Sequence, residues 1–374
     1  MTNTVPLFEP IKIRGLTLAN RIAVSPMCQY SAVDGVPQPW HVQHLGSLAS
    51  SGPGLLMVEA TGVEAIGRIT PGCTGLYSDA CETEFAKILK SVRGVLPVAI
   101  GIQLAHAGRK ASTSVPWRGG VALKPDEGAW ETVSASAIPF SDWHTPRAAT
   151  ESDFARIKTA FVDAAHRALR AGFDLVEIHA AHGYLLHQFL SPLSDHRTDS
   201  YGGSLENRMR FPLEVIRAVR AAWPADRVLG MRISAKDWAD GGWDVDEAVK
   251  FVAAAKAAGV DYCCVSSGGL IHTQKIALGP GYQVAFAERI RRDTGIVTRA
   301  VGMIVEPHQA NEIVASGKGD MVALARAFLD DPRWVWHAAD ALGAVAACPP
   351  QYQRARANAW PGAKLRVELA AAAE

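Results

Sequence analysis

The first apolar run of the chain reads Arg21-Ile22-Ala23-Val24-Ser25-Pro26-Met27-Cys28-Gln29-Tyr30. Its opening residues are apolar and partly β-branched, which predicts a strand over residues 21–26 that is buried on both faces. No G-x-G-x-x-G motif follows this strand, whereas the first strand of a Rossmann sheet is followed by such a glycine-rich turn. The stretch therefore predicts a parallel sheet and disfavours a doubly wound nucleotide-binding domain.

Seven similar runs follow, at residues 54–59, 98–104, 175–179, 228–233, 262–266, 297–301 and 321–325. Amphipathic stretches such as 152–171 and 205–223 separate them, and the first opens with the capping-box sequence Thr150-Glu151-Ser152-Asp153. Eight β–α units in series predict an α/β fold, a single (β/α)8 TIM barrel. Residues 11–18, turning at Gly15, predict an N-terminal hairpin that plugs the bottom of the barrel.

Two connections are much longer than a barrel requires. They span residues 105–150 and 180–204, and both follow strands. We therefore expect both to lie over the C-terminal face, where TIM barrels build their active sites. The alternative is that they only cover apolar surface.

Composition excludes several classes of protein. With 48% hydrophobic and 20% charged residues, the 374-residue chain is not disordered. A net charge of +1 without a basic run gives no indication of nucleic-acid binding. The six cysteines form no C-x-x-C pair, which disfavours zinc ribbons and iron–sulfur clusters. No leader peptide or membrane span is recognisable, so we expect a soluble, cytoplasmic protein. We expect one domain over residues 1–374, ending in a tail from about residue 343.

Polar side chains recur at the predicted carboxyl ends of strands, and His179 and His182 are the most informative pair. Two imidazoles that donate to one oxygen would polarise a carbonyl as an oxyanion hole does. A metal site is the weaker interpretation, because the chain has no H-E-x-x-H helix. The third interpretation is that both are hydrogen-bonded histidines of the core. Tyr184, with an ordinary pKa of about 10, suits a general acid or is a packing residue.

Arg232 lies near the end of the predicted fifth strand, where an unpaired guanidinium would be costly. It either forms a structural ion pair with Glu59 or Glu177, or neutralises a ligand that becomes anionic on reduction. Residues 266–269, Gly302 and Ala325-Arg326 follow the last strands, where this fold commonly binds a phosphate.

These motifs together resemble the Old Yellow Enzyme family of FMN-dependent ene-reductases, and in particular its bacterial NADPH dehydrogenase and xenobiotic reductase branch. The similar segments are residues 20–30, 103–110 (Gln-Leu-Ala-His-Ala-Gly-Arg-Lys), 177–186 (Glu-Ile-His-Ala-Ala-His-Gly-Tyr-Leu-Leu), 199–208 and 351–354. The resemblance extends from about residue 6 to 355, with the motifs in order.

The resemblance implies a non-covalent FMN cofactor and NADPH as hydride donor. His179 and His182 would bind the carbonyl or nitro oxygen of an activated C=C substrate, flavin N5 would pass hydride to the β-carbon, and Tyr184 would protonate the α-carbon. Cys28 would tune the flavin potential, and Tyr30 would contact the substrate. The residues implied to bind FMN are Ser25, Pro26, Met27, Cys28, Ala60, Gln103, Arg232, Gly302, Ala325 and Arg326.

The resemblance also implies a homodimer or a dimer of dimers, in which the C-terminal tail lies at a subunit interface and Arg354 reaches the neighbouring active site. Two positions depart from the pattern. Ala325 replaces a common glycine before the phosphate-binding arginine, and Val301 replaces a tryptophan found in some relatives, which would widen the substrate pocket. Two alternatives stay open: a metal-dependent barrel hydrolase that uses His179 and His182, and a catalytically silent binding protein.

Overall fold

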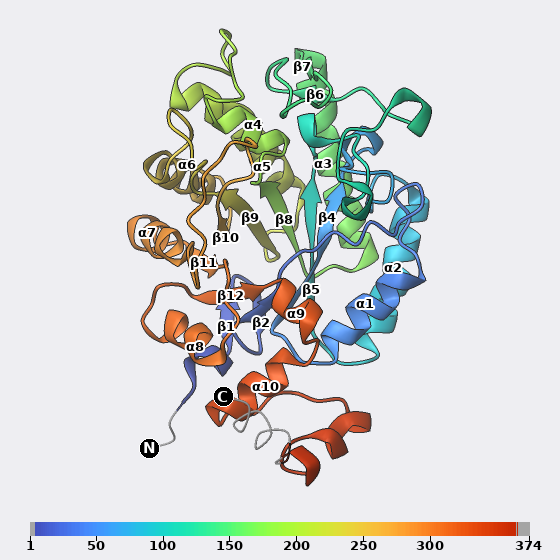
Figure 1. Cartoon of the computed structure of the whole chain (residues 1–374), viewed down its shortest axis with the longest axis vertical. Helices are drawn as coiled ribbons and strands as arrows, with labels where there is room; N and C mark the ends of the chain where they lie inside the picture. Colours follow the sequence, from blue (N-terminus) through green and yellow to red (C-terminus); the bar gives the residue numbers. More distant parts are fainter. Residues whose placement is uncertain (1–3, 364, 366–374) are drawn as a thin grey trace.

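A closed barrel of eight parallel strands forms the centre of the computed structural model, which describes residues 4–363 and residue 365 (Figure 1). Around the barrel the strand order is β10-β11-β12-β3-β4-β5-β8-β9. The barrel strands are β3 (Ile22–Val24), β4 (Leu55–Gly62), β5 (Ala99–Ala105), β8 (Leu175–Ala180), β9 (Val228–Ser234), β10 (Tyr262–Ser266), β11 (Val297–Ala300) and β12 (Met321–Leu324). The predicted TIM barrel is confirmed, and each predicted strand overlaps one of these.

Helices surround the barrel, most of them on its outside, with α4 near its C-terminal face (Figure 1). They are α1 (Pro39–Ala49), α2 (Asp79–Arg93), α3 (Glu151–Ala171), α4 (Leu185–Leu190), α5 (Leu205–Ala222), α6 (Val245–Ala257), α7 (Val284–Thr294), α8 (Pro307–Ala315), α9 (Arg326–Asp330) and α10 (Trp334–Leu342). The capping box before α3 is confirmed, because the Thr150 hydroxyl accepts a hydrogen bond from the Asp153 backbone N–H. Within the described ranges, no helix is long and apolar enough to cross a membrane.

The predicted hairpin plug is also confirmed. It consists of two antiparallel strands, β1 (Ile11–Ile13) and β2 (Leu16–Leu18). Ile13 and Leu18 are buried in one apolar cluster with Leu55, which is the first residue of β4. At the turn, the Gly15 N–H donates to the Asp226 carbonyl, and a Cβ on Gly15 would lie only 2.5 Å from that oxygen. The turn therefore needs glycine, and it ties the plug to the bottom of the barrel.

Closure of the barrel joins the two ends of the sequence. The first barrel strand, β3, pairs in parallel with the last, β12, in the register Val322↔Ile22 and Leu324↔Val24. The N-terminal segment makes a second such contact, because the Leu7 N–H donates to Asn311 Oδ1 on α8 at 3.1 Å. The closed barrel and the helix α8 outside it are therefore both held by contacts between residues about three hundred positions apart.

Both long connections lie over the C-terminal face, as expected (Figure 1). The first contains 3-10 turns and a two-residue parallel pair that were not predicted: η3 (Gly108–Lys110), η4 (Pro116–Arg118), η5 (Pro125–Glu127), β6 (Val133–Ser134) and β7 (Arg147–Ala148). The second begins with α4, whose residues are all buried. Both connections therefore lie beside the ends of the barrel strands.

Candidate active site

The parallel strands bring the predicted polar residues to one end of the barrel. Gln103 on β5 is paired with Glu177 on β8, and His179 on β8 is paired with Arg232 on β9. A bulge in β4 between Val58 and Ala60 brings Ala60 into register with Gln103. Since sequence-distant residues meet only through this register, the site is a property of the closed barrel.

A cavity of about 550 Å³ opens among the ends of the last strands. Ser25, Arg232 and Ser266 line it, and so do Val301, Gly302, Ala325 and Arg326, together with Tyr282 and Gln283 from the connection before α7. Its volume falls in the range of small-molecule and cofactor sites. Four of the residues expected at the phosphate site therefore line one cavity: Ser266, Gly302, Ala325 and Arg326. Arg232 lines the same cavity.

Gly268 and Gly269 belong to the stretch expected at the phosphate site, but they are not among the residues that line this cavity. Both have positive φ angles, and a Cβ on Gly269 would lie 2.6 Å from the His182 Cα. A Cβ on Gly183 would likewise lie 2.3 Å from the Gly269 carbonyl oxygen. The glycines therefore let this loop pack against the backbone that carries the histidine pair.

Arg232 forms neither of the two structural ion pairs considered from the sequence. Glu177 is paired with Arg299 instead, and Glu59 lies against His41 at 3.3 Å. The Arg232 Nε is buried and has no hydrogen-bond partner among the described residues. The residue as a whole is half-buried and lines the cavity, so its positive charge is available to an anionic ligand there.

Glu177, Tyr262 and Arg299 form a buried cluster that the sequence did not reveal. Arg299 Nη2 lies 2.5 Å from Glu177 Oε2, to which the Tyr262 hydroxyl also donates at 2.7 Å. The Gln103 amide nitrogen donates to the other carboxylate oxygen at 2.8 Å. This hydrogen bond fixes the orientation of the Gln103 amide. The signal available in the sequence was one arginine in an otherwise apolar run, Val297-Thr298-Arg299-Ala300.

The two imidazoles lie edge to face, with ring centroids 5.2 Å apart. His179 Nδ1 accepts from the Ala181 N–H at 3.2 Å, so the proton of the neutral ring is on Nε2. His182 Nε2 lies 2.8 Å from the Ser266 hydroxyl. Burial lowers the pKa of both rings, and the positive charge of Arg232 lowers them further. Both histidines are therefore neutral at pH 7, each with one N–H to donate.

Tyr184 lies directly beside this pair. Its ring meets the His179 ring edge to face at 4.9 Å, and the Lys110 ammonium lies 5.3 Å from its centre. Burial raises the pKa of Tyr184 well above its ordinary value, so the phenol keeps its proton. Lys110 donates to the backbone carbonyls of His182 and Gly269, both at 2.9 Å, and was not singled out from the sequence.

Cys28 and Tyr30 follow β3 and are half-buried. Contact with the Cys73 thiol raises the pKa of Cys28, and burial raises it further, so Cys28 is a neutral thiol at pH 7. Burial also raises the pKa of Tyr30, with Cys28 as a neighbour. Pro26 and Met27, between the strand and this pair, are half-buried as well.

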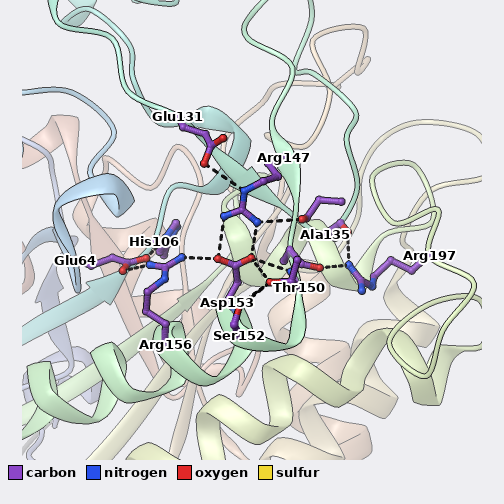
Figure 2. Close-up of polar contacts among 12 residues, drawn as sticks. Glu64, His106, Glu131, Ala135, Arg147, Thr150, Ser152, Asp153, Arg156 and Arg197 are labelled. Carbon is purple, nitrogen blue, oxygen red and sulfur yellow. Dashed lines mark hydrogen bonds and ion pairs between the residues drawn. The ribbon is translucent and has the colours of Figure 1, made fainter.

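His106, two residues after the predicted third strand, belongs to a different set of contacts (Figure 2). Its Nε2 lies 2.8 Å from Glu64, which also pairs with Arg156 on α3. Arg156 and Arg147 both bind Asp153, and hydrogen bonding to Arg147 holds the pKa of Asp153 well below its usual range. These contacts hold the long connection against the start of α3, so His106 has a structural role.

Arg354 is exposed on the 3-10 helix η6 (Pro350–Ala355). This helix lies near the C-terminal end of the described chain, below α10 and away from the top face (Figure 1). The structure therefore does not bring Arg354 to the histidine pair of its own chain. Its expected place in a neighbouring active site stays a prediction, as does the interface role of the tail, of which residues 364 and 366–374 lie outside the described residues.

The metal-dependent alternative finds no ligand set in the part of the chain that the structure describes. There, no three His, Cys, Asp or Glu side chains are grouped so that they could hold a metal ion. The histidine pair is instead surrounded by the cations Arg232 and Lys110, which lower the pKa of both rings.

The fold and the cavity define a TIM-barrel protein in which Arg232 and Arg326 line a cavity beside neutral hydrogen-bond donors. The model of the NADH:flavin oxidoreductase / NADH oxidase family matches residues 6–343, and the chain belongs to this family, that of Old Yellow Enzyme. It is an oxidoreductase, and the expectation of FMN is confirmed.

Two relatives and one solved structure illustrate the similarity. The NADPH dehydrogenase of Geobacillus thermodenitrificans (strain NG80-2) is 46% identical, over 94% of this chain and 98% of its own length. The NADPH dehydrogenase of Bacillus subtilis (strain 168) is 44% identical, over 93% and 98%. Morphinone reductase in complex with tetrahydroNAD superposes with a TM-score of 0.74 at 27% identity, over 92% of this chain and 93% of that one.

The residues present suit FMN. The orphaned Arg232 Nε and the buried Ser25 hydroxyl, which also has no partner among the described residues, both border the cavity. Gly302, with a φ of 112°, keeps the cavity wall free of a Cβ that would lie 2.6 Å from Gln283. Cation, hydroxyl and unobstructed backbone are the groups that a phosphate-bearing ligand requires.

Proposed function

We propose that the chain is an FMN-dependent ene-reductase that uses NADPH to reduce C=C bonds activated by a carbonyl or nitro group, including quinone-like and xenobiotic compounds. One observation carries the proposal: two neutral histidines and a protonated tyrosine lie together beside a cavity with an unpaired arginine. A binding protein would have no need of a proton donor whose pKa is raised by burial next to two N–H donors.

Bound FMN supplies a two-electron hydride carrier. Ser25, Gln103 and Arg232 would hold its ring system, and Arg232 would favour the reduced, anionic form because it places a positive charge beside it. Gly302, Ala325 and Arg326 would bind the phosphate. The backbone after β3, at Pro26, Met27 and Cys28, and Ala60 on β4 would border the ring, with the neutral Cys28 thiol adjusting its reduction potential.

His179 and His182 would bind the activating oxygen of the substrate. His179 donates through Nε2, because its Nδ1 is engaged by the Ala181 N–H. When the Ser266 hydroxyl donates to His182 Nε2, the proton of His182 is on Nδ1 and can be donated to the same oxygen. Two donors on one oxygen draw electrons from the conjugated bond, so the β-carbon becomes electrophilic.

Tyr184 would supply the proton that balances the reaction. The substrate gains a hydride at the β-carbon and a proton at the α-carbon, and the phenol gives up that proton to the forming carbanion. Its raised pKa means that the proton is present throughout the neutral pH range. Tyr30 would contact the substrate from the opposite loop.

The purified protein provides the test. We expect it to be yellow, to lose flavin absorbance anaerobically with NADPH, and to regain it on addition of cyclohexenone with formation of cyclohexanone. A protein that stays colourless and inactive after reconstitution with FMN would refute the proposal, and bleaching by NADPH without recovery by any enone, maleimide or nitroalkene would reduce it to a diaphorase.

We also propose that the enzyme is a homodimer or a dimer of dimers, with Arg354 at a neighbouring active site. The tail supports this because it exposes large apolar side chains, including Tyr352 and Trp360, on either side of Arg354. Light scattering measures the mass. Arg354→Ala should raise KM for the enone, and a monomer with unchanged KM would contradict the assignment.

A further inference from the structure

A second cavity, of about 530 Å³, lies outside the site described above. The connection that contains η4 and η5 forms one wall, and Pro71 and Gly72 form another. Tyr30 also lines it, and the tyrosine hydroxyl has Cys28 as a neighbour. The cavity therefore joins a residue proposed to contact substrate, Tyr30, to the long connection.

The walls of this cavity combine an aromatic ring, a cation and aliphatic side chains. Trp117 meets Tyr30 edge to face, with ring centroids 5.8 Å apart, yet 67% of its surface is exposed. Arg118 is exposed beside it and forms no ion pair with any described residue. Val121 and Leu123 add apolar surface. An exposed tryptophan face next to an unpaired guanidinium suits a planar heterocycle that carries phosphate groups.

Glu127 adds an acceptor to the same cavity. One of its carboxylate oxygens accepts from the Lys124 backbone N–H at 2.8 Å, which fixes the side chain in place. A fixed carboxylate in the same cavity as an arginine is unsuited to a simple anion, because the carboxylate would repel the anion. It suits a nucleoside phosphate, whose ribose hydroxyls and exocyclic amine donate while its phosphates accept.

We infer that this cavity binds the adenosine half of the nicotinamide cofactor, with the adenine on Trp117 and a phosphate on Arg118. The inference rests on the proposed function, since the nicotinamide must reach the flavin while the rest of the molecule extends away from it. A cavity lined by the half-buried Tyr30 on one side and by the exposed Trp117 and Arg118 on the other matches that requirement.

The experiment compares electron donors that have and lack the adenosine half. Flavin reduction is followed anaerobically by stopped flow with NADPH, NADH and 1-benzyl-1,4-dihydronicotinamide, which carries the reactive ring alone. Arg118→Ala should raise the apparent Kd for NADPH about tenfold, the effect of one charge-assisted contact. Trp117→Ala should raise it by a similar factor. Neither variant should change reduction by the benzyl compound. Arg217→Ala, which removes an exposed arginine from α5, is the charge-matched control.

The NADH arm identifies the phosphate. An equal loss with both nucleotides places Arg118 on the pyrophosphate, and a loss confined to NADPH places it on the 2′-phosphate. An unchanged Kd for NADPH in both variants, or an equal loss with the benzyl compound, would overturn the inference. A raised KM for bulky enones alone would assign the cavity to the substrate instead. Wild-type flavin that no donor bleaches would refute the proposed function itself, so the two failures are distinguishable.

Discussion

Arg299 and Glu177 form an ion pair inside the barrel in which both side chains are completely buried. Such a pair is expensive to desolvate, and it is retained only when further hydrogen bonds satisfy the carboxylate. Tyr262 and Gln103 supply those bonds. Since Gln103 is also proposed to hold the flavin, the pair connects the interior of the barrel with the cofactor site.

Removing one member of this pair should destabilise the protein strongly. Arg299→Met leaves the Glu177 carboxylate buried without its cation, and we expect a loss of about 3–5 kcal/mol in the free energy of unfolding. The double variant Glu177→Gln/Arg299→Met carries no buried charge and should recover a large part of that loss. Urea denaturation measures both. A double variant that is as unstable as the single one would show that packing of Arg299, rather than charge, is decisive.

The histidine pair can be tested by ligand binding. In the variant His179→Ala/His182→Ala, affinity for p-hydroxybenzaldehyde should fall by about tenfold for each donor lost, while FMN stays bound. His182 has a φ of 58°, which alanine tolerates poorly, so His182→Asn separates backbone strain from loss of the donor. Titration of the flavin spectrum measures affinity. His166→Ala, at an exposed position on α3, is the control, and unchanged affinity in the double variant would remove the pair from substrate binding.

Tyr184→Phe separates proton transfer from hydride transfer. The variant should slow the oxidative half-reaction with an enone by about 10²-fold or more, and leave reduction by NADPH nearly unchanged. Rapid-mixing kinetics measure each half-reaction. Tyr201→Phe removes a hydroxyl that donates to Glu214 outside the site and should affect neither step. An equal slowing of both half-reactions by Tyr184→Phe would indicate a packing role.

Cys28→Ala should shift the reduction potential of the flavin, because it replaces a polarisable thiol next to Cys73 with a methyl group. Equilibrium photoreduction against a reference dye measures the shift. Cys348→Ala, in the C-terminal part of the chain, is the matched control. A potential that stays the same in Cys28→Ala would leave this residue with a packing role only.

Lys110 gives the protein a specific dependence of stability on pH. Burial lowers its pKa from 10.5 to about 8 in the folded chain. Between these two values the unfolded chain holds the proton and the folded chain has released it, so this group makes stability rise with pH. The stability of Lys110→Met relative to wild type should therefore be highest below pH 8 and should decrease as pH rises towards 10.5.

Urea denaturation across this pH range measures the difference between Lys110→Met and wild type. The two hydrogen bonds that Lys110 donates add a constant offset, so the slope is the informative quantity. Lys87→Met, which removes a largely exposed lysine, controls for general effects of charge. A flat difference for Lys110→Met would mean that the ammonium is solvated in the folded protein.

The sequence predicted the barrel well because each strand is buried on both faces and therefore appears as an uninterrupted apolar run. The ends of the strands were predicted less accurately. Strand β4 continues from the predicted end at Glu59 to Gly62 through a bulge, and no property of single residues marks a bulge. Likewise β6 and β7 have two residues each, too few to produce a period.

The position of a candidate residue at the end of the barrel was predicted where its place in a strand determines it, as for Gln103, His179 and Arg232. It was missed where the partner comes from a remote strand. Arg299 and Glu177 are separated by 122 positions, and only the closed barrel brings them together. Trp117 and Arg118 were hidden for another reason, since they lie on an irregular connection whose path depends on contacts such as those of Arg147 with Asp153.

The pairing of β3 with β12 has a consequence for how this protein is made. A nascent chain that ends before Met321 carries an unsatisfied strand edge on each side of the incomplete sheet, and such edges template aggregation. Truncations within the last barrel unit should therefore fail as insoluble protein rather than as weakened enzyme. For the same reason, we expect the emerging chain to remain prone to aggregation until its final strand has left the ribosome.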